Sequence, residues 1–465
     1  MNGTKNSQNL SFLIKNKGRN MFNEVDIASL SVFRISFGII MLIEVFRYFD
    51  HDWISSYWMK PLMNFSFWPF DFLHPLPGDG MYYLFIFLGV LSIFIALGLF
   101  YRTSMVLFFL SFSYVYLLEQ TRYLNHFYLI ILLSFVLIFL PANRNFSLDS
   151  KIFRNIKSNT QPLWSLWLLR FMIAIPYFFG GVAKINQDWL RGQPLQLWLA
   201  KETDVPLIGE YFTEYWMIIL LSYSGLLLDL LIVPLLLFKK TRIWAFFVAF
   251  IFHIMNSQMF TIGVFPWFMI FATLIFFQPS WPRYIIAAFS HNPLFLPTPT
   301  QNNLIEELTQ KQKLVKVALI TWVSIMILLP FRHWIYPGNV NWTEMGHKYA
   351  WHMKLRTKSA RGTFTIIEKE GAFEIEIDPK NYLERWQRNK VLARPTLIWM
   401  FAHKLKESYT KKGIQVEVYA DIRAKLNGRK YQQFIDAKID LTSVPYPIWK
   451  KPTWVLPLTT ELRRE

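Results

Sequence analysis

The sequence predicts a polytopic α-helical membrane protein with about eight or nine spans, followed by a small, strand-rich extramembrane α+β domain. Two features of composition predict the membrane part: 53% of the 465 residues are hydrophobic, and 18% are aromatic. This chain is too apolar for an ordinary soluble protein and too long for a single span. The third observation is a change near residue 331, where long apolar runs give way to short alternating ones.

The predicted membrane domain covers residues 27–330, after a polar and basic N-terminal segment at 1–26. About nine apolar stretches are long enough to cross or enter a bilayer, at 27–46, 81–100, 104–118, 127–140, 164–183, 216–238, 243–260, 262–277 and 314–329. The seventh and eighth are almost continuous, so they could instead form one bent re-entrant pair. The count would then be eight.

Charges in short loops predict the orientation in the membrane. Basic residues follow the fourth and sixth stretches: Arg144, Lys151, Arg154, Lys157, Lys239, Lys240 and Arg242. We therefore expect these loops and the N-terminal segment to be cytoplasmic. With nine crossings, Lys184 and the C-terminal part would face the periplasm or the lumen of the endoplasmic reticulum.

Residues 331–465 are predicted to form a compact extracytoplasmic domain of roughly a hundred residues or more. Alternation of apolar and polar residues predicts strands at 362–367, 373–378 and 414–419. The pair Asn427-Gly428 predicts a hairpin turn. A small helix is expected at 381–405.

Charge and cysteine content exclude several classes of function. The net charge of +18 is spread over loops and tail without the dense basic block that tracks nucleic acid, so membrane lipids are the expected partner and nucleic acid is not. The chain has no cysteine, which excludes disulfides and thiolate catalysis. Its histidines occur singly, and we expect no metal site.

Lys184 is the strongest candidate for a reactive group. It follows the fifth apolar stretch, after Pro176 and the pair Gly180-Gly181, which could leave room for a ligand beside the amine. An ammonium at the edge of hydrocarbon loses hydration, so the neutral amine is favoured and can accept a proton. The alternative is that its side chain extends into the headgroup layer, as lysines near the ends of membrane helices usually do.

Two further polar clusters lie at membrane depth. His126 stands at the start of the fourth stretch, where it could act in catalysis or cap a helix. His253, Asn256 and Ser257 share one helical face in the seventh stretch. Because polar groups in lipid need partners, that face should point inward, for interhelical hydrogen bonding or for catalysis.

Six strings of residues, spread over most of the chain, occur together: Asn125-His126-Phe127-Tyr128-Leu129; Gly181-Val182 with Lys184-Ile185 and Asp188-Trp189; Phe252-His253 with Met255-Asn256-Ser257-Gln258, Phe260 and Ile262-Gly263; Pro279 with Trp281-Pro282-Arg283; Asn341-Trp342-Thr343; and Leu426-Asn427-Gly428-Arg429. Together they resemble the vitamin K-dependent gamma-carboxylase family, whose intramembrane domain also occurs in bacterial proteins. The third string is long and specific.

The resemblance implies an enzyme of the carbon-carbon lyase or carboxylase class. Reduced vitamin K, the hydroquinone, is deprotonated and oxygenated by O2 to the epoxide, and a strong oxygen base removes the γ-proton of a glutamate in a peptide or protein. The carbanion then takes up CO2. The family match implies Lys184 as the base for the hydroquinone, His126 in the carboxylation half, and His253 in the intramembrane polar string.

The same resemblance suggests which residues contact cofactor and substrate. For the quinone we expect contacts from Tyr177, Phe178, Gly180, Gly181, Trp189, Asn256 and Ser257. For the peptide we expect contacts from Trp342, His347 and Tyr349.

Departures from animal members limit the implied function. Ala183 stands where those members have a lysine, and His347 replaces a functional tyrosine. The short outer domain makes propeptide docking doubtful and, with the lack of cysteine, is typical of a bacterial member, so we expect a bacterial inner membrane with the active site toward the periplasm. Two alternatives stay open: an epoxidase without peptide carboxylation, and a non-catalytic transporter or lipid-binding protein.

Overall fold

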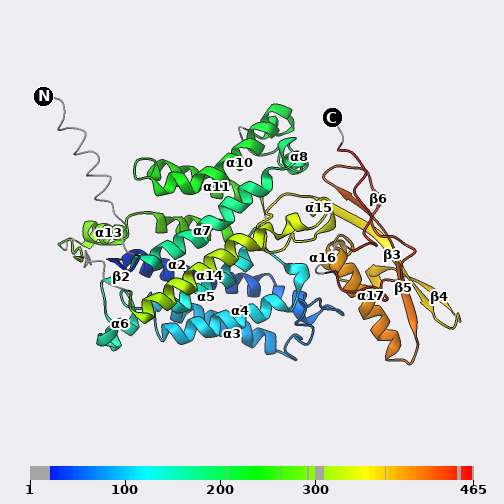
Figure 1. Cartoon of the computed structure of the whole chain (residues 1–465), viewed down its shortest axis with the longest axis horizontal. Helices are drawn as coiled ribbons and strands as arrows, with labels where there is room; N and C mark the ends of the chain where they lie inside the picture. The colour runs from blue at the N-terminus through cyan, green and yellow to red at the C-terminus, as the bar shows by residue number, and fades with distance from the viewer. Residues whose placement is uncertain are drawn as a thin grey trace.

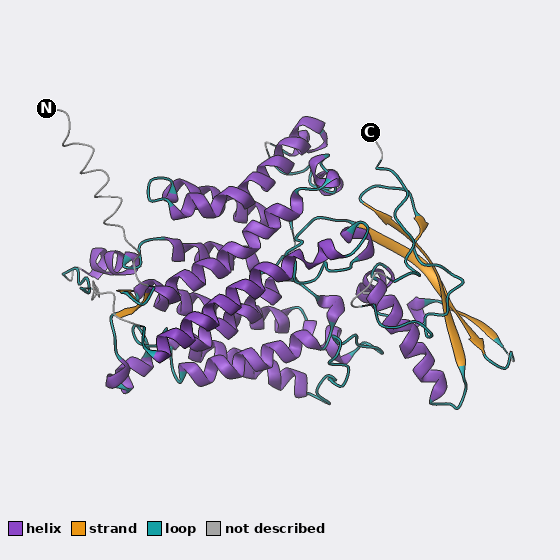
Figure 2. Cartoon of the chain, viewed as in Figure 1, coloured by secondary structure: helices purple, strands orange, loops and turns teal. Residues whose placement is uncertain are grey.

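A computed structural model describes residues 21–206, 208–260, 262–290, 293–298, 308–371, 373–447 and 452–462. Long helices gather on one side of the molecule, and a sheet with two helices forms the other side (Figures 1 and 2). Each side has its own hydrophobic core. Residues 1–20, most of the predicted N-terminal segment, lie outside the described residues.

The helical side contains a helix within each of the nine predicted apolar stretches. These are α2 (Ala28–Asp50), α3 (Gly80–Leu97), α4 (Tyr101–Leu117), α5 (Asn125–Phe139), α7 (Leu163–Lys184), α10 (Tyr215–Leu237), α11 (Arg242–Met259), α12 (Phe265–Thr273) and α14 (Gln310–Phe331). Short helices connect them: α6 (Leu148–Ile152), α8 (Gln187–Leu190), α9 (Leu195–Leu199) and α13 (Trp281–Ser290). A small antiparallel ribbon of β1 (Glu24–Asp26) and β2 (Thr160–Pro162) joins the start of α2 to the start of α7.

Five helices in the described part of the chain are long and apolar enough to cross a membrane. They are α2, α3, α7, α10 and the stretch Gln310–Ile335, which contains α14. Two shorter apolar helices, Asn125–Phe139 and Phe265–Phe276, belong to the same bundle. The membrane class is therefore confirmed, whereas the count of eight or nine crossings stays a prediction.

The other side of the molecule is an α+β unit. Its sheet has the order β4-β3-β5-β6, formed by β3 (Lys358–Glu368), β4 (Glu374–Ile377), β5 (Val416–Leu426) and β6 (Gln432–Gln433). All three neighbouring pairs are antiparallel. Alternate residues of β5 are buried from Val416 to Leu426, as the period-two pattern predicts. The predicted strands are thus confirmed, although β5 extends further than expected.

Two helices cover the inner face of this sheet. They are α16 (Arg385–Leu392) and α17 (Pro395–Thr410), and Phe401 of α17 packs edge to face on Phe364 of β3. The prediction of one helix at 381–405 is wrong, because Pro395 lacks an N–H and disfavours a helical residue before it. Pro395 instead occupies the first turn of a new helix.

The hairpin turn after β5 connects the two sides of the molecule. Asn427 and Gly428 both have positive φ, 48° and 79°, as a turn of this kind requires. The turn meets Asp188 of α8. Arg429 donates to both carboxylate oxygens of Asp188, with Nη1 2.7 Å from Oδ2 and Nη2 2.6 Å from Oδ1, while Asn427 Nδ2 donates to Oδ2 at 2.8 Å. This bidentate pair is buried, so it fixes α8 against the sheet.

Replacing Arg429 with alanine should destabilise the protein by about 3–5 kcal/mol, because it leaves the buried carboxylate of Asp188 without its charge partner. Thermal unfolding of the purified protein in detergent measures the effect. Arg423→Ala is the matched control, because Arg423 lies on β5, the strand just before the turn that carries Arg429, but is exposed. Equal melting temperatures for the two variants would contradict a stabilising role of the pair.

Candidate active site

A cavity of about 840 Å³ lies between the helical bundle and the α+β unit. Its walls come from α2, α5, α7, α10 and α11, from the segment 344–358 that precedes and begins β3, and from α16. Seven of the predicted site residues line it: Lys184, His126, His253, Tyr177, Trp189, Asn256 and His347. Positions far apart in sequence therefore meet around one chamber.

Lys184 is the last residue of α7 and is 6% exposed. Its Nζ donates to the carboxylate of Asp229 on α10 and also lies 3.4 Å from the carbonyl oxygen of Gly180. The ring of Trp189 stands 5.3 Å from Nζ. The amine thus points inward to the cavity wall and not to a headgroup layer. Asp229 is its partner in a buried ion pair.

Gly180 and Gly181 are not among the residues that line the cavity, and the room they leave is filled by side chains of α10 and, at Gly180, also by Met353. A Cβ on Gly181 would stand 2.7 Å from the side chain of Leu230, and one on Gly180 would stand 3.1 Å from Oδ2 of Asp229. Real Cβ atoms do not approach neighbours as closely as 2.7 Å. The expectation that these glycines make room for a ligand is therefore corrected: they let α10 come close enough for Asp229 to reach Lys184.

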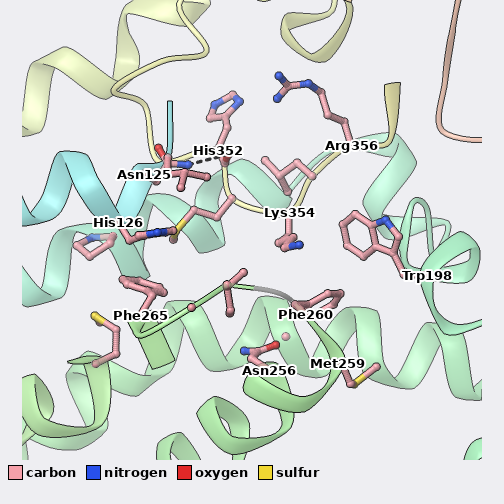
Figure 3. A pocket seen from close by; sticks show the side chains of 18 of the residues that line it. Asn125, His126, Trp198, Asn256, Met259, Phe260, Phe265, His352, Lys354 and Arg356 are labelled. Atoms are coloured by element: carbon pink, nitrogen blue, oxygen red, sulfur yellow. Dashed lines mark hydrogen bonds between the residues drawn. The ribbon is translucent and has the colours of Figure 1, made fainter. Parts of the chain in front are cut away.

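Tyr177 and His253 join α7 to α11 across the cavity wall. The hydroxyl of Tyr177 lies 2.5 Å from Nε2 of His253, and both side chains are buried. The hydrogen bond between the two helices therefore gives the buried His253 ring a polar partner. The same residue also lines the cavity. Ser257 is not among the residues that line the cavity, and its hydroxyl donates to the carbonyl of Ile254 in its own helix at 2.7 Å. Asn256 does line it (Figure 3).

His126 lies in the first turn of α5, with its ring stacked on Phe265 at a centroid distance of 5.3 Å. The helix begins without a side-chain cap, so helix capping does not explain the histidine. The neighbouring Asn125 donates to the carbonyl of His352 at 3.1 Å (Figure 3). This bond holds the segment 344–358 against α5, close to His126.

Three of the predicted contacts lie away from the cavity. Phe178 is 48% exposed and lies on the outer surface of α7. Its neighbour Tyr177 lines the cavity, and consecutive side chains of an α-helix point about 100° apart. Trp342 is buried in the core of the α+β unit, where its Nε1 donates to the carbonyl of Leu456. Tyr349 packs against Tyr123 and does not line the cavity. Of the three residues expected to contact the peptide, only His347 reaches the cavity.

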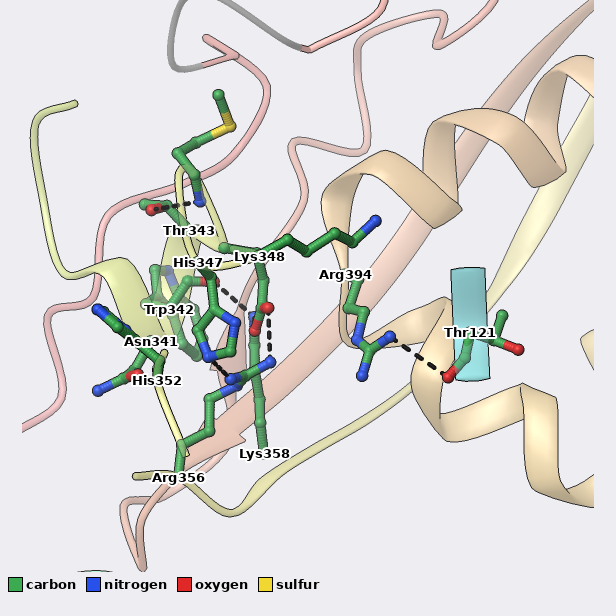
Figure 4. Close-up of polar contacts among 12 residues, drawn as sticks. Thr121, Asn341, Trp342, Thr343, His347, Lys348, His352, Arg356, Lys358 and Arg394 are labelled. Carbon is green, nitrogen blue, oxygen red and sulfur yellow. Dashed lines mark hydrogen bonds and ion pairs between the residues drawn. The ribbon is translucent and has the colours of Figure 1, made fainter. Parts of the chain in front are cut away.

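The sequence prediction missed a basic cluster at the extramembrane end of the cavity. It consists of Lys348, Lys354, Arg356, Lys358, Lys390 and Arg394, and all six line the cavity. Arg356 contacts Nε2 of His347 and donates to Glu344 at 2.6 Å, and Lys358 donates to the carbonyl of Trp342 (Figure 4). The sequence did contain a pattern that could have revealed part of this cluster, because Lys354, Arg356 and Lys358 alternate with uncharged residues.

Burial makes this end of the cavity unusual electrostatically. It lowers the pKa of Lys348, of Lys358 and of Lys390 to about 7 in each case. It also lowers the pKa of His352 to about 3 and that of His347 well below its ordinary value, so both imidazoles are neutral at pH 7. An anion bound beside these lysines would favour their charged forms.

Comparison with known protein families gives two matches that together cover most of the chain. A family model of the HTTM domain matches residues 22–281. A model of the vitamin K-dependent gamma-carboxylase lumenal domain matches residues 311–461. No solved structure matches the chain.

Replacing Lys358 with methionine should weaken the dependence of stability on pH above 7. The pKa of Lys358 is about 7 in the folded protein against 10.5 ordinarily, so between these values the unfolded chain binds more protons and stability rises with pH. One such lysine contributes at most about 1.4 kcal/mol per pH unit. Melting temperatures from pH 7 to 9.5 test this, with the exposed Lys369→Met as control. Equal slopes in wild type and K358M would refute the assignment.

Proposed function

The chain belongs to the vitamin K-dependent gamma-carboxylase family, and on that premise we propose that it is a membrane enzyme that carboxylates glutamate in a peptide or protein. The proposed cofactor is reduced vitamin K, with O2 and CO2 as co-substrates. The proposed location is a bacterial inner membrane, with the active site toward the periplasm.

The observation that carries this proposal is the buried pair of Lys184 and Asp229 on the wall of the cavity. Burial excludes water from both side chains, and the hydrogen bond that Lys184 donates to Asp229 holds the amine at the cavity wall. A neutral amine is the form that accepts a proton from a ring hydroxyl.

The cavity fits a quinone with an isoprenoid tail. Its volume of about 840 Å³ lies in the range of small-molecule pockets. One wall is apolar and comes from α10 and α11, where Leu228, Val248 and Ile251 line the cavity. The isoprenoid tail is proposed to lie along this wall. When bound, reduced vitamin K would supply, with oxygen, the strong base that removes a γ-proton from glutamate.

The chain's own residues have distinct proposed roles. Lys184 accepts the first proton, and Asp229 balances its charge. Trp189 closes the cavity beside the amine and is held by its Nε1, which donates to the carbonyl of Ser222 at 2.9 Å. Water has little access to a side chain that is 6% exposed, so a reactive oxygen base near Lys184 would be shielded. His126 faces the same chamber and is proposed for the carboxylation half.

Lys184→Ala should reduce epoxide formation from hydroquinone and oxygen by at least about 100-fold, the usual contribution of a general base. Lys184→Arg should be equally impaired, because a guanidinium keeps the charge beside Asp229 but cannot accept a proton. Lys201→Ala, an exposed lysine outside the cavity, is the control. Epoxide is measured by chromatography, and an active K184R would show that Lys184 acts through its charge alone.

Labelled CO2 separates carboxylation from oxygenation alone. A peptide that contains glutamate should acquire label only when hydroquinone and oxygen are both present, because proton removal depends on the base formed from them. The basic cluster favours this reaction over epoxidation alone, since neither hydroquinone nor O2 carries a charge that would need it. Epoxide without labelled peptide would assign the protein to the epoxidase alternative.

A further inference from the structure

Lys354 is an ammonium that projects into the cavity without an acidic partner. The segment 344–358 runs from the α+β unit to the bundle and turns sharply at Lys354, whose φ is 52°. From there the side chain reaches toward Phe260, between His126 and Trp198 (Figure 3). A left-handed conformation is rare for residues other than glycine and asparagine, so the fold maintains this orientation at a cost.

The acidic side chains that line the cavity are already paired with other cations. They are Glu44, Asp229 and Glu344. Glu44 accepts from Arg47 at 2.5 Å, Asp229 accepts from Lys184, and Glu344 accepts from Arg356 at 2.6 Å. No described acidic side chain lies within ion-pair distance of Lys354. The cavity therefore carries an excess of positive charge at this position.

Aromatic rings are the contacts of the Lys354 ammonium among the described residues. Its Nζ lies 4.4 Å from the ring centroid of Phe260 and 5.6 Å from that of Trp198. Aromatic faces attract a cation less strongly than a carboxylate does at the same site. Burial lowers the pKa of Lys354, as expected for an ammonium that lacks a counter-ion.

A second polar group on the same cavity also lacks a partner. His352 is 5% exposed, and neither of its ring nitrogens forms a hydrogen bond within the described part of the chain. Buried polar atoms without hydrogen-bond partners destabilise the folded protein. Two unsatisfied groups, Lys354 and His352, thus lie two residues apart on the segment that closes the cavity. Such a pattern indicates a polar ligand.

We propose that Lys354 binds the side-chain carboxylate of the glutamate to be carboxylated. This proposal rests on the proposed function, because the glutamate is the reactant that is an anion at neutral pH, whereas hydroquinone, O2 and CO2 are neutral. The ammonium replaces its weak aromatic contacts by a charge-assisted hydrogen bond, and the γ-carbon of the same glutamate is brought into the chamber that holds Lys184 and His126. Lys354 is then a residue that determines specificity for glutamate over glutamine.

Binding of a fluorescent peptide to the full chain in zwitterionic nanodiscs tests the proposal without quinone or oxygen. Wild type should bind a glutamate peptide about tenfold or more tightly than the matched glutamine peptide, as expected for one charged contact. Lys354→Met should remove this preference and Lys354→Arg should retain it. The exposed Lys369→Met should behave as wild type. Lys354→Gln provides a second neutral variant should K354M fail to fold.

The outcomes separate the carboxylate site from the overall reaction. A preference for glutamate that persists in K354M or K354Q, or that is absent from wild type, overturns the proposal even if carboxylation occurs. A preference that depends on Lys354 supports the site even if no carboxylated peptide forms, in which case the proposed function alone fails. A third outcome is that anionic lipid competes with the peptide only when Lys354 is present, while wild type does not distinguish glutamate from glutamine. This outcome would assign the site to a lipid headgroup and overturn the proposal.

Discussion

The buried contact between Lys184 and Asp229 is the interaction on which the rest of the site depends. It requires α7 and α10 to approach closely, which Gly181 permits because any larger residue would meet Leu230. A charged pair in hydrocarbon is tolerated only when each ion has its partner, so the two helices have little freedom to separate. The stability of the bundle and the presence of a basic amine beside the cavity therefore have one physical cause.

The α+β unit completes the chamber. The segment 344–358 enters it from the extramembrane side, and Asn125 holds this segment by donating one hydrogen bond from Nδ2 to the carbonyl oxygen of His352. Asp188 and Arg429 fix the sheet against α8, which lies directly after Lys184 in the chain. The amine and the basic cluster are thus positioned relative to each other by two separate anchors. In this chain the cavity is lined by residues from both matched regions, 22–281 and 311–461.

The two ends of the cavity have opposite character, and this division suits the reactants of the proposed reaction. Toward the bilayer, α10 and α11 present an apolar wall to an isoprenoid tail, and toward the α+β unit the basic cluster presents a positive field to a carboxylate. Charges are effective there because burial excludes the water that would screen them. The neutral imidazoles of His347 and His352 add hydrogen-bonding capacity without adding charge.

The sequence by itself determined the membrane class, the helices of the bundle and the strands of the α+β unit, because hydrophobic period and run length depend on local composition. It also supplied Lys184, His126 and His253 as candidate site residues, and all three line the cavity. Only the tertiary structure decided that Asp229 pairs with Lys184, that Phe178 faces outward, and that Lys354 enters the cavity. Such contacts join residues far apart in sequence, and their geometry follows from helix packing that no local pattern encodes.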